Sequence, residues 1–454
     1  CYVRDKVRYT TSMSDTPDTS ERAIEVLKGN DRGLYTVPAE ELYPHQWLWD
    51  SCFIAIGQRH YDVERAKMEI LSLLRGQWSN GMIPHMIFSR HNKYSTDRNT
   101  WRSWVSPFAP DDVLTSGITQ PPMLAETVVR IGEKLTLADR RSWYRQVIKE
   151  LIAYHEWLYL ERDPHDEGLT LQVHPWETGL DNTPPWMSEL HQHLLPGWIR
   201  FLQKTRLELA VGLFRRDTRV VPASQRFSNI DSMALFDAQR RLRRKEYNID
   251  RILSHSLFAI QDLAFNSIFI RANDQLIAIA KTLRMDLPDA LLEKIKLTKK
   301  SFEDLWDPYT ESYYSRDFIT HKLIKEPSIA SLLPLYAGCI SPEKAALLVK
   351  SIENEHIFGP AHPIPSVPLN SPWFKQECYW QGPTWFNTNW LVVDGLKRYG
   401  YHDHAEALIE SSLELVKDGH FYEYYDPING KPLGSPNFSW TAAVALDWLS
   451  PQKH

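Results

Sequence analysis

The sequence predicts an all-α protein in which antiparallel helical hairpins close into an α/α barrel. Three observations favour this fold. Apolar residues recur mostly at steps of three and four, and the strict alternation of a half-buried strand is scarce. Long loops rich in Trp, Pro, Gly and Asn separate the helical stretches, whereas the other connections are short and charged. Long structureless loops in a compact domain are usually functional, so we expect them to gather at one end and hold a ligand in the barrel mouth.

The helices are expected where apolar periodicity and end signals coincide. The first, 18–28, begins with Asp18 and Glu21 in capping-box spacing and stops before a glycine. The stretches 257–283 and 402–418 each place their apolar residues on one face. The remaining helices are expected at 62–78, 120–135, 141–160, 189–212, 288–305, 327–338, 342–353, 385–399 and 437–449.

The long loops divide the chain into a barrel and an insertion. They are expected at 31–50, 79–122, 162–187, 355–384 and 419–437. Within 182–250 the periodicity blurs and arginine accumulates, which indicates an excursion that caps the barrel mouth. The expected organisation is therefore a catalytic barrel formed by 18–181 and 251–452, a cap at 182–250 and an N-terminal extension at 1–17.

Charge and cysteine usage exclude several classes of partner. A formal net charge of −5 over 454 residues gives no electrostatic basis for binding nucleic acid or an anionic membrane. The basic run Arg240–Lys245 is expected on a solvated helix face. No apolar run reaches about 18 residues, and no N-terminal signal core is present. The four scattered cysteines form no C-x-x-C pair, which fits a reducing compartment such as the cytoplasm. Homo-oligomerisation is left open.

The stretch HPWETGLDNTPPW, residues 174–186, is the most informative motif of the chain. Trp176 and Trp186 offer flat apolar faces for the C–H surfaces of a pyranose. Gly179 permits a close backbone turn, and the prolines that follow prevent a helix directly after Asp181. The pattern therefore predicts a carboxylate on a rigid loop beside a sugar, although aromatic, Pro-rich loops also occur as plain packing.

A second carboxylate in an aromatic setting lies near the C-terminus. Glu423 stands within FYEYYD, residues 421–426, after an expected helix and before a turn rich in Gly and Pro. Flanking aromatic rings would partly desolvate it, which is how a protein tunes a catalytic acid or base. The alternative is that one of 57 acidic residues falls beside tyrosines by chance.

Further loops pair aromatic faces with short polar groups. Such pairs hold a hexose by ring stacking and by hydrogen bonds to neighbouring hydroxyls, although each alone also fits core packing. Phosphate-binding glycine loops and the G-x-S-x-G elbow are absent, and the histidine pairs lack a metal-ligand set, so neither a cofactor nor a metal is expected. The candidate sugar-binding residues of these loops are Tyr43, Trp47, Trp49, Asp50, Gln120, Tyr379, Trp380, Gln381 and Trp385.

Together these segments resemble glycoside hydrolase family 63, specifically its small members that hydrolyse mannosylglycerate and glucosylglycerate. The likeness runs from the first expected helix to the C-terminus. It implies an (α/α)6 barrel with a helical cap, an inverting mechanism, no cofactor and a role in the turnover of compatible solutes. The motifs that carry it, in chain order, are LYPHQWLWD, NGMIPH, TSGITQPP, HPWETGLDNTP, YWQGPTW, EYYDPINGKPLG and FSWTA.

The resemblance also implies roles for single residues. Asp181 matches the general acid of the family and Glu423 its general base. Arg226, in the cap segment PASQRFSN, matches the arginine that binds the glycerate, and a guanidinium fork suits a carboxylate. Tyr94 matches a tyrosine on a mobile loop. The positions that line the sugar subsite are Tyr43, Trp47, Trp49, Asp50, Gln120, Gly179, Tyr379, Trp380 and Trp385.

The chain departs from the family pattern at the end of the site that holds the aglycone. After Arg226 it reads FSNIDSMALF, without the Pro and Tyr that the resemblance implies, and SPNFSW replaces a Gln-containing run. The expected reaction is hydrolysis of 2-O-α-glucosyl- or mannosyl-D-glycerate to the hexose and glycerate. The alternatives are a trehalase-like or oligosaccharide α-glucosidase with a neutral aglycone, or a protein that only binds carbohydrate. A helical isoprenoid cyclase would need Asp-rich motifs that the sequence lacks.

Overall fold

A closed ring of helices forms the centre of the molecule, as the sequence predicts. The computed structural model describes residues 18–90, 95–189, 195–208, 215–255, 258–359 and 362–451. Each helix of the ring packs on the next, and the last packs on the first. In chain order the ring consists of α2 (Leu48–Gln58), α5 (Leu124–Gly132), α12 (Leu263–Leu283), α14 (Pro334–Ala337), α16 (Phe386–Arg398) and α18 (Ser439–Leu449).

A second layer of helices surrounds this ring. α3 (Val63–Leu74) packs on α2 and α5, and α6 (Leu137–Glu161) packs on α5 and α12. This pairing of inner and outer helices makes the fold an (α/α)6 barrel, with the apolar core between the layers. The other outer helices are α1 (Thr19–Gly29), α13 (Asp289–Ser301), α15 (Pro342–Glu353) and α17 (His402–Glu414).

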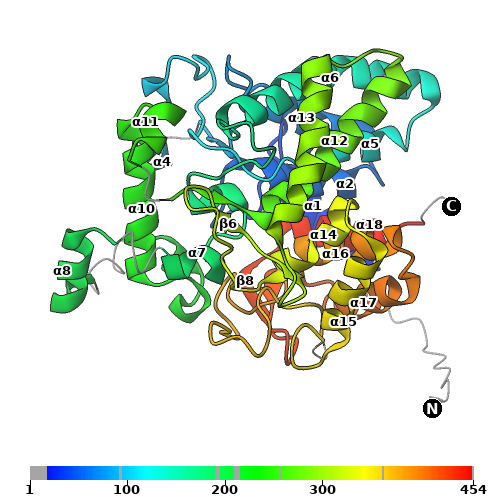
Figure 1. Ribbon diagram of the computed structural model, residues 1–454. Coiled ribbons are helices and arrows are strands. Elements are labelled where there is room, and N and C mark those ends of the chain that lie inside the picture. The colour runs from blue at the N-terminus through cyan, green and yellow to red at the C-terminus, as the bar shows by residue number, and fades with distance from the viewer. Residues whose placement is uncertain are drawn as a thin grey trace, which may run out of the picture.

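The helices between the expected barrel segments lie to one side of the barrel. α8 and α10 pack together, and α4, which comes from an earlier loop, packs on α10 (Figure 1). α10 begins with a capping box, in which the Ser228 hydroxyl accepts from Asp231 N and the Asp231 carboxylate accepts from Ser228 N. The helices of this region are α4 (Ser95–Trp101), α7 (Pro184–Glu189), α8 (Gly197–Thr205), α9 (Asp217–Val220), α10 (Asn229–Arg244) and α11 (Ile249–Leu253).

Short strands and 3-10 turns fix the loops. The strands form antiparallel pairs, namely β1 (Gln46–Trp47) with β2 (Met86–Ile87), β3 (Ile260–Gln261) with β6 (Arg316–Asp317), β4 (Trp306–Asp307) with β5 (Ser312–Tyr313), and β7 (Tyr422–Tyr425) with β8 (Pro432–Pro436). The 3-10 turns are η2 (Ser103–Val105), η3 (Pro175–Thr178), η6 (Ala223–Gln225), η7 (Phe302–Leu305) and η8 (Ile329–Leu332).

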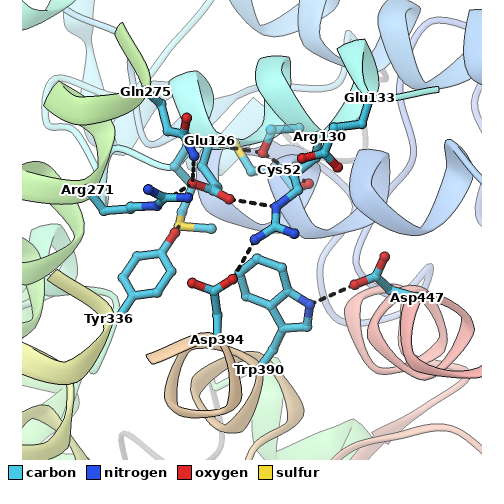
Figure 2. A network of polar contacts seen from close by, with 12 residues as sticks. Cys52, Glu126, Arg130, Glu133, Arg271, Gln275, Tyr336, Trp390, Asp394 and Asp447 are labelled. Atoms are coloured by element: carbon cyan, nitrogen blue, oxygen red, sulfur yellow. Dashed lines mark hydrogen bonds and ion pairs between the residues drawn. The ribbon is translucent and has the colours of Figure 1, made fainter. Parts of the chain in front are cut away.

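A network of buried ion pairs links four helices of the ring (Figure 2). Glu126 of α5 accepts from Arg130 over 2.6 Å and forms an ion pair with Arg271 of α12 at 2.8 Å. Arg130 reaches on to Asp394 of α16 over 2.5 Å, and Trp390 of the same helix donates to Asp447 of α18. Each carboxylate has at least one donor, which a buried charge requires.

Three helical predictions differ from the structure. The predicted loop 31–50 and the residues after it contain α2, whose residues are all buried, so its sequence has no polar face to mark it as a helix. The predicted helix 327–338 is a 3-10 turn followed by the short α14, which ends at Gly338 with φ +70°. The predicted helix 189–212 is wrong at residues 195 and 196, which precede the start of α8 and are not helical, while residues 190–194 and 209–212 of this prediction lie outside the described residues.

Over the described residues, no helix combines the length and the apolar character needed to cross a membrane.

Candidate active site

The segments predicted to carry the site lead into the ring at one end of the barrel. Tyr43, Trp47 and Asp50 lie just before α2 or in its first turn, and Gln120 precedes α5. The stretch that carries Tyr379 to Trp385 runs into α16, and β7, which carries Glu423, precedes α18. Because these ring helices all begin at their site-bearing segments, residues far apart in sequence meet at one mouth.

Asp181 stands on a loop that the neighbouring residues hold rigid. The other carboxylate of its motif, Glu177, is fully buried and pairs with Arg162 over 2.7 Å, which anchors η3. Gly179 adopts φ +75°, and a Cβ there would lie 2.8 Å from the ring of Trp49, so glycine is required. Asp181 itself is half-buried and accepts from Tyr379 Oη over 3.3 Å. Burial raises the pKa of Asp181 to about 7 despite the nearby Arg226, which suits a proton donor at neutral pH.

Glu423 lies on β7, where its carboxylate is 1% exposed. Its Oε1 accepts from Tyr43 Oη over 2.6 Å, and its Oε2 accepts from Ser435 N of β8 over 3.1 Å. Burial raises the pKa of Glu423, while Arg226 and these two donors favour its charged form. The arrangement holds a carboxylate at a fixed place and keeps it able to accept a proton.

Arg226 lies between the two carboxylates. Its Nη1 stands 3.3 Å from Glu423 Oε1, and its guanidinium covers the ring of Tyr379 at 4.1 Å, the same tyrosine that donates to Asp181. On the other side its Nε faces Asp217 Oδ2 at 3.5 Å. One cation thus connects the candidate acid, the candidate base and a third carboxylate.

The turn that carries Arg226 is tied to the strand that carries Glu423. Tyr424 Oη donates to Gln225 O over 2.5 Å, and Gly434 N donates to the Gln225 side chain over 2.9 Å. The capping box of α10 follows two residues after Arg226. These contacts fix the backbone at both ends of the arginine, so the fold sets where the Arg226 backbone lies relative to Glu423.

A buried stack of tryptophans packs against the segments that carry the two carboxylates. Trp380 and Trp385 lie face to face at 3.8 Å with their planes 4° apart, and both are almost fully buried. Trp49 packs against Trp380 at 6.1 Å, and Trp440 contacts Trp49, Trp380 and Trp385. Trp385 therefore lies behind Trp380 and supports it.

Two polar residues of the predicted sugar subsite lie in the same region. Asp50 is 5% exposed, and burial together with the charges of Glu423 and Asp181 raises its pKa well above the ordinary value. Gln120 accepts from Trp49 N over 3.5 Å. The side chain of Asp50 therefore belongs to the same electrostatic environment as the candidate catalytic pair.

A cavity of about 650 Å³ opens over this site. Tyr43, Trp47, Trp176, Asp181 and Arg226 are among the residues that line it. The indole nitrogen of Trp47 is buried and has no hydrogen-bond acceptor within the described part of the chain. A sugar hydroxyl in the cavity would satisfy that donor, because a buried N–H without a partner is costly.

Some predicted residues lie elsewhere. Gln381 is 3% exposed and its side chain accepts from Cys378 Sγ, so it forms a hydrogen bond within the protein. Trp186 is fully buried and donates from Nε1 to Asp181 O over 3.3 Å, so it supports the loop and offers no face to a sugar. Tyr94 lies outside the described residues.

The structure adds residues that the sequence analysis missed. Asp217 reaches Arg226 and is itself held by Arg215 over 2.6 Å. Phe227 lines the cavity and lies 5.9 Å from the ring of Tyr379. Asn182 accepts from Trp380 N over 2.9 Å and so joins the loop of Asp181 to that of Tyr379. Of these three residues, only Asn182 lies in a motif that the sequence analysis had singled out, directly after Asp181.

No group of three or more His, Cys, Asp or Glu residues that could hold a metal ion occurs among the described residues.

A helical barrel with a half-buried and a buried carboxylate beside an aromatic cavity is the arrangement of a glycoside hydrolase, and the comparisons with known proteins give the same class. The profile of the mannosylglycerate hydrolase MGH1-like glycoside hydrolase domain matches residues 43–441. The chain belongs to this family, within glycoside hydrolase family 63.

Relatives cover almost the whole chain. It is 39% identical to the mannosylglycerate hydrolase of Thermus thermophilus, over 94% of this chain and 99% of that protein. It is 33% identical to the glucosylglycerate hydrolase of Mycolicibacterium hassiacum, over 94% and 97% respectively. A crystal structure of the family 63 mannosylglycerate hydrolase from Thermus thermophilus, in complex with Tris and D-glycerate, matches with a TM-score of 0.85 at 37% identity, covering 95% of this chain and all of that one.

Proposed function

We propose that this enzyme is an inverting α-glycosidase that hydrolyses 2-O-α-glucosyl- or mannosyl-D-glycerate to the hexose and glycerate. The observation that carries the proposal is the placement of Arg226, a buried cation on the cavity wall that pairs with the buried Glu423 and lies close enough to the half-buried Asp181 to act on its charge. An arginine in that place supplies a partner for an anionic aglycone, which a neutral disaccharide does not need. The names of the two relatives support the same substrate class.

In the proposed mechanism Asp181 acts as the general acid and Glu423 as the general base. Asp181 donates its proton to the glycosidic oxygen as the bond to the anomeric carbon breaks. Glu423 removes a proton from a water molecule that attacks the same carbon from the opposite face, so the configuration inverts. Burial raises the pKa of Asp181 to about 7, which keeps a protonated fraction available at neutral pH.

Residues of the cavity wall and of the buried layer next to it bind and orient the substrate. We assign the sugar to the region beside the buried Trp49 and Trp380, with Asp50 and the indole nitrogen of Trp47 facing its hydroxyls. The aglycone carboxylate is assigned to Arg226. The trehalase-like alternative lacks a specific observation in its favour, because it leaves the charge of Arg226 without a ligand partner.

The division of the chain and its cellular context are part of the same proposal. The barrel comprises 18–181 and 251–452, and the cap comprises 182–250, supported by the packing of α8 and α10 beside the cavity.

We propose a cytoplasmic enzyme that acts on a small molecule, without a nucleic-acid or membrane partner. The free thiols of Cys52, Cys339 and Cys378 fit a reducing compartment. Whether it forms a homo-oligomer is a matter for size measurement in solution.

The test is to incubate the purified enzyme separately with glucosylglycerate, mannosylglycerate and trehalose and to follow the anomeric proton of the released sugar by NMR. Release of the β-anomer from a glycerate glycoside is the expected result and would also identify the sugar. Release of the α-anomer would contradict inversion. Turnover of trehalose alone would contradict the anionic aglycone and favour the trehalase-like alternative.

A further inference from the structure

The candidate base is engaged by the same arginine that is assigned to the substrate. Glu423 Oε1 accepts from Tyr43 Oη and also faces Arg226 Nη1 at 3.3 Å, and its Oε2 accepts from Ser435 N. A carboxylate offers about four lone-pair positions, so these contacts leave little room for a water molecule. Water must nevertheless reach Glu423 if that residue is the base.

The charge of Arg226 weakens the base as well as crowding it. A cation beside a carboxylate stabilises its charged form and lowers its affinity for a proton. Arg226 acts in this direction on both Glu423 and Asp181. Its ion pair with Glu423 thus opposes the step in which Glu423 takes a proton from water.

We propose that an anionic aglycone draws Arg226 away from Glu423 and thereby releases the base for its own hydrolysis. This inference rests on the function proposed above. Arg226 and Asp181 both line the cavity, so a carboxylate next to the scissile bond would meet the same guanidinium that faces Glu423. A guanidinium fork that binds one carboxylate bidentately cannot hold a second one with the same two N–H groups.

The surroundings of Arg226 allow it to turn without leaving the site. Asp217 lies 3.5 Å from Nε, the part of the guanidinium nearest the stem, and Arg215 holds Asp217 in place over 2.6 Å. The ring of Tyr379 lies under the guanidinium at 4.1 Å. Rotation about the contact between Nε and Asp217 would carry Nη1 from Glu423 to the ligand while the charge remains paired.

A neutral aglycone would leave the ion pair between Arg226 and Glu423 intact. The sugar of such a substrate would bind in its subsite, but Arg226 would remain paired with Glu423. Deprotonation of the water by Glu423, and with it turnover, would therefore be slow even at saturating substrate. Discrimination between charged and neutral aglycones would then appear in kcat as well as in KM.

Glycosyl fluorides separate this effect from substrate binding. Fluoride leaves without a proton from Asp181, so hydrolysis of α-glucosyl or α-mannosyl fluoride reports on the base. The experiment measures kcat for whichever fluoride is turned over, with and without D-glycerate, and uses glycerol as the neutral control. We expect glycerate to raise kcat by about tenfold, which corresponds to about 1.4 kcal/mol in the barrier, and glycerol to have no effect.

Two variants complete the test. Arg226→Gln should hydrolyse the fluoride at a rate raised toward that of the glycerate-activated wild type, and glycerate should no longer stimulate it. Arg240→Gln removes another cation from the cavity wall that is no partner of Glu423, and glycerate should still activate this variant. Thermal unfolding of both variants checks that the fold is intact.

The outcomes separate this inference from the proposed function. Inhibition or no effect of glycerate on the wild type would overturn the release of the base, and so would activation that persists in Arg226→Gln. The effect of glycerate on the kcat of the wild type tests the inference even if a variant does not fold. Failure to hydrolyse both the fluorides and the glycerate glycosides would instead overturn the proposed function.

Discussion

At the scale of single residues, the two carboxylates of the site differ in what surrounds them. Asp181 is half-buried with one tyrosine donor, whereas Glu423 is almost fully buried and has three partners, one of them a cation. Fewer stabilising contacts leave Asp181 readier to hold a proton, and the contacts of Glu423 favour its charged form against the burial that raises its pKa. This difference supports the proposed roles of Asp181 as acid and Glu423 as base.

Substitution of each carboxylate should have a distinct signature. Asp181→Asn should lower kcat on a glycerate glycoside by about 10²- to 10⁴-fold, the range of general acid catalysis, and lower it far less on a glycosyl fluoride, which needs no acid. Glu423→Gln should lower both rates. Steady-state kinetics on the two substrates measures this. Equal losses of Asp181→Asn on both substrates would contradict its role as the acid.

The pKa of Asp181 predicts both a pH profile and a stability trend. The acid form is required, so kcat/KM should fall as the pH rises through about 7. The folded-state pKa lies above the ordinary value of 3.8, so the folded protein binds a proton that the unfolded chain has lost, and this contribution to stability disappears between pH 4 and 7. Above pH 7, Asp181→Asn should therefore unfold at a higher temperature than the wild type, and at pH 4 the difference should vanish.

Sequence patterns located these two carboxylates because each lies in a local run of aromatic residues and turn formers. The partners of Arg226 and of Glu423 could not be found in that way. Asp217 lies in a polar stretch, and Ser435 contributes only its backbone N–H, so neither position carries a distinctive side-chain pattern. Their importance comes from the approach of β7, β8 and η6 in space, which local sequence does not encode.

At the scale of elements, the start of α10 positions the arginine. Ser228 caps this helix and lies two residues after Arg226, and its hydroxyl accepts from Asp231 N over 3.1 Å. Ser228→Ala should lower the free energy of unfolding by about 0.5 to 2 kcal/mol, the usual range for loss of an N-cap. The looser turn should also raise KM for the glycerate glycoside, because Arg226 would lose its fixed direction.

A second capped helix provides the matched control. Ser341 caps α15 by accepting from Lys344 N over 3.3 Å, and α15 packs on α14, away from the residues of the site. Ser341→Ala should lower the free energy of unfolding similarly and leave KM unchanged. Urea unfolding and steady-state kinetics on both variants measure this pair of effects, and an equal rise in KM would refute the positioning role of the α10 cap.

The helix α2, which the sequence patterns missed, shows why a fully buried helix is hard to predict. Most outer helices show apolar residues on one face, and these were predicted well, as for α15 and α17. α2 is buried on every side, so its run LWDSCFIAIGQ has no polar stripe and reads as the end of an aromatic loop. A helix that is buried on every side thus lacks the alternation of apolar and polar faces by which a surface helix is recognised in a sequence.

At the scale of the whole molecule, the polar network of Figure 2 connects ring helices that lie far apart in the sequence, namely α5, α12, α16 and α18. Glu126 is 1% exposed, accepts from Arg130 and the Gln275 amide, and forms an ion pair with Arg271. Glu126→Gln would leave the charges of two arginines partly uncompensated. Loss of one partner from a buried pair is typically destabilising by about 3 to 5 kcal/mol, so we expect an effect of that order in urea unfolding at pH 7. Glu293→Gln, in an exposed pair with Lys296, should change the free energy of unfolding hardly at all.

The pH dependence of this loss of unfolding free energy shows whether Glu126 stabilises the ring through its charge or through its packing. Burial opposes ionisation, but Arg130 and Arg271 outweigh it and lower the pKa of Glu126 to about 2, against an ordinary value of 4.5. A lowered pKa contributes stability that is complete above pH 4.5 and is lost as the pH falls toward 2. The difference between the wild type and Glu126→Gln should therefore be largest at neutral pH and shrink steadily below pH 4.5. A difference that stays constant across this range would mean that the carboxylate stabilises the ring by packing, and that the arginines do not need its charge.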